Sequence, residues 1–439
     1  MSAGAATKAE AAAPGTVAAE SGKTPRELFA WCLYDWATQG FPTVITTFVF
    51  ATYFTTAVAA DSVDATSQWA YAISASALAV AVVSPLLGAI ADRSGRRKPW
   101  ILIFTLVCVA GSAGLWFIRP DPAFAIAALI LLGVANFGFE SASVFYNAML
   151  RDLVPRHMIG RLSGWGWGAG YIGGLACLFV ALFLLIRPDP PLFGLDAAAL
   201  EPVRATAILV AVWFVVFSIP FFMITPDAPR SGIAPMEAVR QGIATLIGTF
   251  RNVREYRNVG YFLIAHMIYT DGLNTLFTVG GIYAAVTFGM DVQQVMLFGI
   301  AMNVTAGLGA FAFGWIDDWI GPKRTLYIAI GSMSVLGLIL LLIETQLMFW
   351  VFALPLGIFL GPAQAASRSL MARIVPSHLQ AEMFGLYALT GKATAFVGPA
   401  AFGAATAMFE SQRAGMATVL FFFLAGMLLL IPVKAEEQP

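Results

Sequence analysis

The sequence predicts an all-α integral membrane protein with twelve transmembrane helices in two six-helix halves. Three observations lead to this fold class. Of the 439 residues, 59% are hydrophobic and only 11% are charged, whereas soluble domains carry about 25% charged residues. Long apolar stretches recur along the whole chain, and motifs of its first half return in its second half. The few polar residues could not cover so much apolar surface in water, and lipid as the solvent removes that difficulty.

A helix needs about 20 mostly apolar residues to cross roughly 30 Å of hydrocarbon. The first helix is expected to begin after Thr24, because Thr24 and Glu27 form a capping-box pattern with Pro25 at the first helical position. The Ala-rich residues 1–24 are expected to form a disordered cytoplasmic tail. Twelve stretches qualify as spans, and they are residues 28–60, 68–91, 100–118, 123–150, 162–186, 205–224, 259–289, 295–316, 326–343, 347–372, 383–409 and 414–433.

The basic residues predict the orientation of these spans. If both termini face the cytoplasm, nineteen of the 25 lysines and arginines lie on the cytoplasmic side, four lie outside and two lie within spans. The chain then divides into an N-terminal half (25–224), a cytoplasmic linker (225–258), a C-terminal half (259–433) and a short cytoplasmic tail (434–439). In a bacterium, the expected location of this multi-pass protein is the cytoplasmic (inner) membrane.

The linker is expected to contain an amphipathic helix that lies at the membrane surface. Its apolar residues fall on one helical face, while the segment is too short and too polar to be a thirteenth span. These apolar residues are Met236, Val239, Ile243, Leu246, Ile247 and Phe250.

An internal repeat relates the two halves. The loop at 88–98 (GAIADRSGRRK) returns at 314–324 (GWIDDWIGPKR), and the V-P-x-H sequence at 154–157 returns at 375–378. In the first span of each half, an aspartate and a phenylalanine recur at the same spacing, as Asp35 with Phe41 and as Asp271 with Phe277. Parallel halves of this kind place a substrate site between them, near the middle of the membrane.

The loop at 88–98 resembles the signature loop of the major facilitator superfamily at every defined position, G-x-x-x-D-R-x-G-R-R-K. The resemblance implies the major facilitator fold. The first span, residues 33–54 with its Y-D-W-A core, resembles the opening helix of the vacuole-effluxer-like branch. Fungal members of that branch are autophagy-related amino-acid effluxers, so the resemblance implies a secondary transporter that could export amino acids.

The resemblance also implies that this loop is a latch that stabilises an outward-open state. Asp92 can accept hydrogen bonds from the N-terminus of another helix or pair with an arginine. In the second copy a tryptophan, Trp319, replaces the arginine, so that copy is expected to latch less well. The alternative is a loop that only sets the topology. The candidate gating residues are Gly88, Asp92, Arg93, Gly95, Arg97 and, in the second copy, Asp318.

Charged residues within spans are the strongest site markers, because burying each in a membrane costs at least about 2.5 kcal/mol. Three acids, Asp35, Glu140 and Asp271, face two bases, Arg368 and Lys392. At least one acid is therefore expected to lack a basic partner, and burial then favours its protonated form, as a proton-coupling site requires. The alternative is a set of ion pairs that only hold helices together.

The other candidate site residues are polar and lie near these charges in the sequence. Arg368 and Lys392 are the candidates to hold a substrate carboxylate or phosphate. His266 is a candidate proton carrier, although a lone histidine in a span can equally be a hydrogen-bonded structural residue. The remaining candidates for substrate binding or coupling are Tyr34, Gln39, Asn136 and Asn274.

We expect a monomeric secondary active transporter that moves a small polar solute by alternating access, with amino-acid efflux and proton coupling as the finer expectation. The alternatives are efflux of amphipathic toxicants and a solute sensor without transport. The sequence contains no metal cluster, nucleophile–base motif or P-loop, so no enzyme activity, metal or cofactor is expected. The net charge is zero, and no attraction to nucleic acid is indicated.

Overall fold

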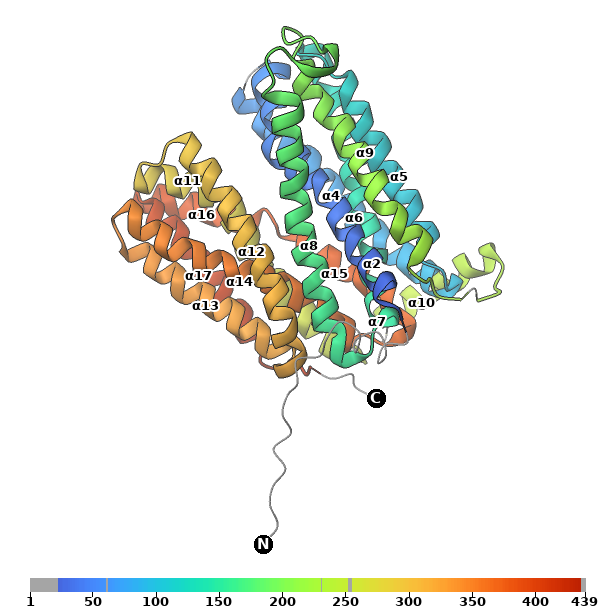
Figure 1. Cartoon of the computed structure of the whole chain (residues 1–439). Coiled ribbons are helices and arrows are strands. Elements are labelled where there is room, and N and C mark those ends of the chain that lie inside the picture. Colours follow the sequence, from blue (N-terminus) through green and yellow to red (C-terminus); the bar gives the residue numbers. More distant parts are fainter. Residues whose placement is uncertain (1–22, 61, 230, 252–254, 436–439) are drawn as a thin grey trace.

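The computed structural model describes residues 23–60, 62–229, 231–251 and 255–435, and the regular structure of these residues is entirely helical. The helices form two bundles of six membrane spans each. The bundles converge at the end of the molecule where α7 (Leu150–Leu153) and α10 (Pro235–Arg251) lie, and they diverge toward the opposite end (Figure 1).

The N-terminal bundle contains the first six spans. Its first span changes twice from α-helix to π-helix, and its fifth span ends in a π-helical turn. The elements are α2 (Pro25–Thr38), η1 (Phe41–Phe48), α3 (Phe50–Tyr53) and η2 (Phe54–Val58) in span 1, α4 (Ser62–Ser94), α5 (Lys98–Gly114), α6 (Ala125–Ala148) with the short α7 (Leu150–Leu153), α8 (Ile159–Val180) with η6 (Ala181–Ile186), and α9 (Glu201–Ile224).

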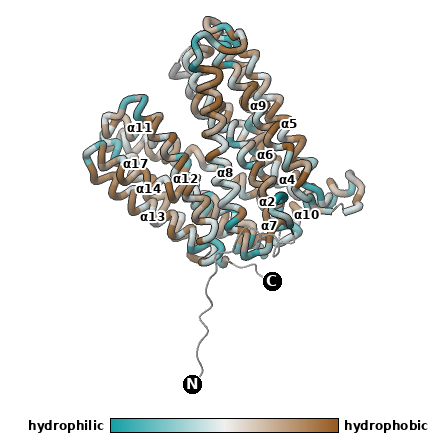
Figure 2. Tube along the Cα trace, in the orientation of Figure 1, coloured by the Kyte–Doolittle hydropathy of each residue, from teal (hydrophilic) through white to brown (hydrophobic). Residues whose placement is uncertain are grey.

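The C-terminal bundle follows a linker that contains one helix, α10 (Pro235–Arg251). Its spans are α11 (Arg257–Phe288), α12 (Val292–Ile320), α13 (Pro322–Leu342), α14 (Gln346–Ile374), α15 (Gln380–Ala393) with α16 (Val397–Phe409), and α17 (Gln412–Leu429). Hydrophobic residues dominate the middle of the helices in both bundles, and hydrophilic residues gather at their ends (Figure 2).

The predicted start of the first helix is confirmed. Thr24 is the N-cap of α2, its hydroxyl accepts a hydrogen bond from the Glu27 amide, and the Glu27 carboxylate accepts one from the Thr24 amide. Pro25 occupies the first helical position, where its missing N–H costs nothing.

Two of the twelve spans, α11 and the pair α15 and α16, differ from the pattern of one long apolar helix per span. By length and composition, ten helical stretches of the described residues qualify as membrane spans, and these do not include α11 or the pair α15 and α16. The stretch 383–409 is not one continuous helix as predicted, because the chain leaves the helix between Ala393 and Val397. α11 carries the polar residues His266, Asp271 and Asn274, which lower its hydropathy.

The linker helix is present as predicted, but its buried side is the one with small residues. Ala238 is buried, and Gly242 lies so close to Ile90 of α4 that a Cβ atom would come within 2.8 Å of its backbone nitrogen. The apolar residue Met236 is 79% exposed, and Ile247 is 48% exposed. The side chain of Phe250 lies outside the described residues.

Glycines allow the two bundles to touch where they converge. A Cβ atom at Gly88 of α4 would lie 2.3 Å from the carbonyl oxygen of Ala381, and one at Gly385 of α15 would lie 2.7 Å from the backbone nitrogen of Pro85. We call the end of the molecule with these contacts the closed end. Close backbone approach through small residues is a common way to pack membrane helices, because lipid supplies no hydrophobic force between them.

We predict that Gly88→Ala or Gly385→Ala opens the closed end, because the added methyl group has no room. An overpacking cost of about 1.4 kcal/mol would shift a two-state equilibrium tenfold. The measurement is the rate of maleimide labelling of Ser84→Cys, since Ser84 is buried beside Gly385.

The three native cysteines are buried and give a low background. Gly403→Ala is the matched control, because no atom lies within 4 Å of the Cβ position there. Equal labelling rates in the Gly88 and Gly403 variants would contradict the prediction.

Candidate functional site

Two aspartates hold the closed end together across the bundles. Asp92, at the end of α4, accepts hydrogen bonds from the amides of Ala381 and Glu382 at the start of α15, both at 3.0 Å. Asp318, near the end of α12, accepts bonds from the amides of Gly160 and Arg161 at the start of α8, at 2.9 and 3.1 Å. Each carboxylate thus caps a helix of the opposite bundle, where free N–H groups and the helix dipole favour negative charge.

The two repeated motifs of the sequence meet in these caps. Each V-P-x-H sequence leads into a single 3₁₀ turn, η5 (Arg156–Met158) or η8 (Ser377–Leu379), and the capped helix begins directly after it. The aspartate loop of one half therefore binds the helix that follows the V-P-x-H sequence of the other half.

Arginines surround both aspartates. Arg97 lies 3.4 Å from Asp92 and also pairs with Asp152. Arg373 lies 3.0 Å from both Asp317 and Asp318.

The second copy keeps the cap although Trp319 replaces the arginine, so the structure gives no sign of the expected weakness. The side chain of Trp319 is 82% exposed and takes no part in the cap. Arg161, whose amide donates to Asp318, also donates a hydrogen bond from its Nε atom to the same carboxylate at 3.1 Å.

Two other candidate gating residues contact the linker instead of the opposite bundle. Arg93 donates hydrogen bonds to the Thr245 hydroxyl of α10 at 2.7 and 3.0 Å. Gly95 has a φ of +83°, which only glycine adopts without strain, and it lies against the backbone of Pro229. These residues tie the loop to the linker, Arg93 through α10 and Gly95 through the segment before it.

Deeper between the bundles, Arg368 of α14 is buried in the N-terminal bundle with 2% exposure. It pairs with Asp35 at 3.0 Å, donates to the hydroxyl and carbonyl oxygens of Ser163 at 2.9 and 2.6 Å, and donates to Asn147 at 3.2 Å. Its guanidinium group also lies over three aromatic rings, those of Trp31, Tyr146 and Trp167, at 5.2 to 5.9 Å from their centroids. Asp35 and Arg368, two of the five predicted in-span charges, thus meet across the two bundles.

The second pair of in-span charges also joins the bundles. Lys392, at the end of α15, lies 2.9 Å from Glu140 of α6. The Lys392 side chain is 38% exposed and that of Glu140 is 17% exposed, so this pair is open to a solute, in contrast to Arg368. Lys392 is ten residues, or about 15 Å, along α15 from the cap at Glu382. The chain leaves the helix immediately afterwards, which frees backbone groups beside the pair.

Polar residues of α11 line this break in the eleventh span. His266 shares a hydrogen bond of 3.1 Å with the Thr390 hydroxyl, and Asn274 donates to the carbonyl oxygen of Gly391 at 3.4 Å. Asp271 is 2% exposed, and one of its carboxylate oxygens has no hydrogen-bond partner among the described residues. The Thr394 hydroxyl, in the break, lies close to it without a hydrogen bond of good geometry. Of the three in-span acids, Asp271 is the one without a basic partner in the described part of the chain.

The other three candidates lie apart from this site. Tyr34 is fully buried inside the N-terminal bundle and bonds Thr105 of α5 at 2.7 Å, so its predicted contact with a solute is wrong for this state. Asn136 donates to Ser76 of α4 at 2.7 Å, again within one bundle. Gln39 packs against Gly170 of α8.

The sequence reasoning missed several residues of the site. The aromatic rings and polar groups around Arg368 lie on three separate helices, so no local sequence pattern marks them. The one available signal was general: a buried arginine needs partners. The break beside Lys392 had a local signal, since Gly391, Gly398 and Pro399 flank it and such residues interrupt helices.

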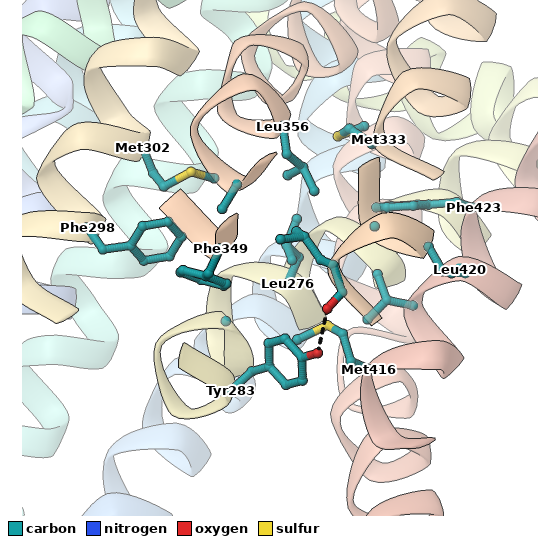
Figure 3. A pocket seen from close by; sticks show the side chains of 15 residues that line it. Leu276, Tyr283, Phe298, Met302, Met333, Phe349, Leu356, Met416, Leu420 and Phe423 are labelled. Atoms are coloured by element: carbon teal, nitrogen blue, oxygen red, sulfur yellow. Dashed lines mark hydrogen bonds between the residues drawn. The ribbon is translucent and has the colours of Figure 1, made fainter. Parts of the chain in front are cut away.

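A separate apolar pocket lies inside the C-terminal bundle, and none of the charged site residues described above lines it. Phe298, Met302, Phe349, Met416 and Phe423 are among the residues that line it (Figure 3). Its one drawn hydrogen bond joins the Tyr283 hydroxyl to the carbonyl oxygen of Leu340 at 3.0 Å. Among the described residues, no group of three or more His, Cys, Asp or Glu side chains could hold a metal ion.

Two six-helix bundles with charged residues between them define a secondary transporter of the major facilitator fold. The chain belongs to the family described as "Vacuole effluxer Atg22 like", whose profile matches residues 23–438. It is 27% identical over 412 residues to the uncharacterized MFS-type transporter YxiO of Bacillus subtilis, which covers 93% of this chain and 95% of that protein. It is 23% identical over 440 residues to Autophagy-related protein 22 of Coccidioides immitis, covering 82% of this chain and 70% of that protein.

Solved structures support the same fold. The structure of FucP, a major facilitator transporter in the outward conformation, superposes with a TM-score of 0.72 at 12% identity and covers 93% of this chain and 98% of FucP. The proton:xylose symporter XylE gives a TM-score of 0.70 at 16% identity and covers 92% of this chain and 94% of XylE. At these identities the likeness shows the fold alone, and membership of the family described as "Vacuole effluxer Atg22 like" identifies the chain as a transporter rather than an enzyme.

We predict that Asp92→Asn and Asp318→Asn each destabilise the closed end, because each carboxylate accepts two cross-bundle bonds from helix-start amides, and Asp318 also accepts one from the Arg161 side chain. Loss of a capping charge costs about 1 kcal/mol, which corresponds to a roughly fivefold change in a two-state equilibrium. Labelling of Ser84→Cys should accelerate accordingly in each variant.

Asp121→Asn is the matched control, because Asp121 caps a short turn within one bundle by accepting from the Ala123 amide at 2.8 Å. An effect of Asp92→Asn without one of Asp318→Asn would restrict the latch to the first copy.

Proposed function

We propose that this transporter moves a small zwitterionic solute of the amino-acid class by alternating access, with protons as the coupling ion. The observation that carries the proposal is the ion pair of Glu140 and Lys392, which joins the two bundles, is partly exposed, and lies at the break in the eleventh span. In transporters, discontinuous helices commonly form substrate sites between the repeats.

A zwitterion suits this pair because it carries both complementary charges. Its carboxylate can take the place of Glu140 at Lys392, and its ammonium group can take the place of Lys392 at Glu140. The solute would then replace one direct bond between the bundles by two bonds to itself, which links its binding to the relative position of the bundles. The membership of the family described as vacuole effluxers favours export of such a solute.

Asp271 is the candidate proton carrier. It is buried and lacks a basic partner among the described residues, and it lies beside Thr394 in the break that follows Lys392. Gain or loss of a proton there would change the charge next to the solute site. Proton-coupled transport in the structural neighbour XylE agrees with this coupling ion.

The proposed location is the cytoplasmic membrane, with both termini and the closed end facing the cytoplasm. The distribution of lysine and arginine supports this orientation. The structure would then represent the outward-open state, in agreement with its similarity to FucP in the outward conformation.

The proposed substrate class can be tested by counterflow of labelled amino acids into liposomes that contain the purified protein. We expect accumulation that unlabelled amino acid competes away. Glu140→Gln and Lys392→Gln should each reduce it at least tenfold, the factor that corresponds to loss of about 1.4 kcal/mol.

Glu201→Gln is the matched control, because Glu201 pairs with Arg204 at 3.9 Å within one bundle. If no amino acid accumulates with a folded protein, the proposed substrate class is wrong, and a panel of sugars, organic acids and cationic drugs then identifies the substrate.

The proposed coupling predicts that Asp271→Asn separates exchange from accumulation. The variant cannot release a proton at this position, so counterflow should persist within about threefold while accumulation driven by a pH gradient disappears. Asp196→Asn, in an outer loop, should keep both activities. Retention of pH-driven accumulation in Asp271→Asn would move the coupling role to another acid.

A further inference from the structure

The surroundings of Arg368 form a complete cation site that belongs to one bundle. The groups that contact the guanidinium come from α2, α6 and α8 of the N-terminal bundle, and Arg368 itself comes from α14 of the C-terminal bundle. We call these groups the arginine socket. They are Trp31, Asp35, Tyr146, Asn147, Ser163 and Trp167.

The socket is held in shape by contacts that do not involve Arg368. The rings of Trp31 and Tyr146 stack at 4.3 Å with an interplanar angle of 11°, and the Tyr146 hydroxyl donates to the backbone oxygen of Trp31 at 3.0 Å. Gly166 closes one side, because a Cβ atom there would lie 2.3 Å from an Asp35 oxygen and 2.8 Å from Arg368. The N-terminal bundle therefore has the socket built whether or not Arg368 fills it.

Alternating access must empty this socket. Arg368 is five residues, or about 7.5 Å, along α14 from Arg373, which belongs to the closed end. When the bundles separate at that end, α14 moves away with its bundle and withdraws Arg368. A buried carboxylate and three ring faces would then be open to that side of the membrane without their cation.

We propose that the arginine socket is a second ligand site, which binds an organic cation of the guanidinium class in the state that opens at the closed end. Asp35 supplies the counter-charge, Ser163 and Asn147 supply hydrogen-bond acceptors, and the three rings supply cation–π attraction. Arg368 and the bound cation exclude one another, so the cation holds the closed end open. The inference rests on the alternating access of the proposed function but not on its substrate.

The chemistry favours a planar guanidinium over other cations. Arg368 donates through its Nε, Nη1 and Nη2 atoms to acceptors around the guanidinium plane, while rings lie against it. A guanidinium matches both kinds of contact, whereas an ammonium group lacks the flat face for stacking and a neutral molecule lacks the charge for Asp35.

The test empties the socket without separating the bundles. Arg368→Ala should unfold at a lower temperature than the parent protein, and methylguanidinium at millimolar concentration should raise its unfolding midpoint in a saturable way. A rise of roughly 2–4 °C is expected near saturation. Urea, a neutral molecule of nearly the same shape, should give no rise, and neither should methylguanidinium with the double variant Asp35→Asn, Arg368→Ala.

A second measurement uses the parent protein and covers the case in which Arg368→Ala does not fold. Methylguanidinium present only on the side of the closed end should slow counterflow, and urea should not. The proposal is overturned if methylguanidinium neither stabilises a folded Arg368→Ala protein nor slows counterflow, or if urea has the same effects. Binding to Arg368→Ala is read from unfolding and needs no transported substrate, so a failure of the amino-acid assignment leaves that measurement intact.

Discussion

The structure depends on a pair of reciprocal helix caps. Each bundle provides one aspartate and one helix start with free N–H groups. Each aspartate accepts hydrogen bonds from the N–H groups at the helix start of the other bundle. Neither bundle can complete a cap alone, because its own aspartate lies at the end of a different helix. The caps therefore act only while the bundles are together, and they break together when the bundles part. A buried N–H group without a partner is costly, which gives the closed state its stability and the opening step its barrier.

The position of Gly88 and Gly385 follows from the same constraint. A carboxylate reaches two consecutive amides of a facing helix only when the two backbones approach closely, and a side chain at either glycine would keep them apart. The repeat of the aspartate loop and the V-P-x-H sequence in both halves can be understood in this way. The two motifs are the two partners of one contact, so a duplicated chain keeps both or loses both.

Much of this fold could be predicted from the sequence, because its signals are local. Apolar length predicts the twelve spans, and ten helices of the described residues also qualify as spans by length and composition. The Thr24 capping box predicts where the first helix begins, and the repeat predicts two related bundles. Counting the charges within spans predicted at least one acid without a basic partner, and among the described residues that acid is Asp271. The crossed pairing of the motifs was not predictable, because one sequence does not say which helix faces which loop. Tyr34 was misplaced for a related reason, since a position beside Asp35 says little about which side of the helix faces the solute.

The helix that follows the first cap also connects it to the proposed solute site at Lys392 and Glu140. α15 begins under Asp92, and Lys392, next to its last residue Ala393, lies ten residues and about 15 Å beyond the cap at Glu382, with no proline or break between. A solute that pulls Lys392 away from Glu140 therefore acts on one end of a rigid rod whose other end is the capped helix start. The break after Ala393 separates this rod from α16, so α15 can tilt without moving the outer part of the span. A continuous eleventh span would transmit the same tilt through the whole bundle. The break therefore accounts for how a small solute could affect a contact more than a dozen ångströms away.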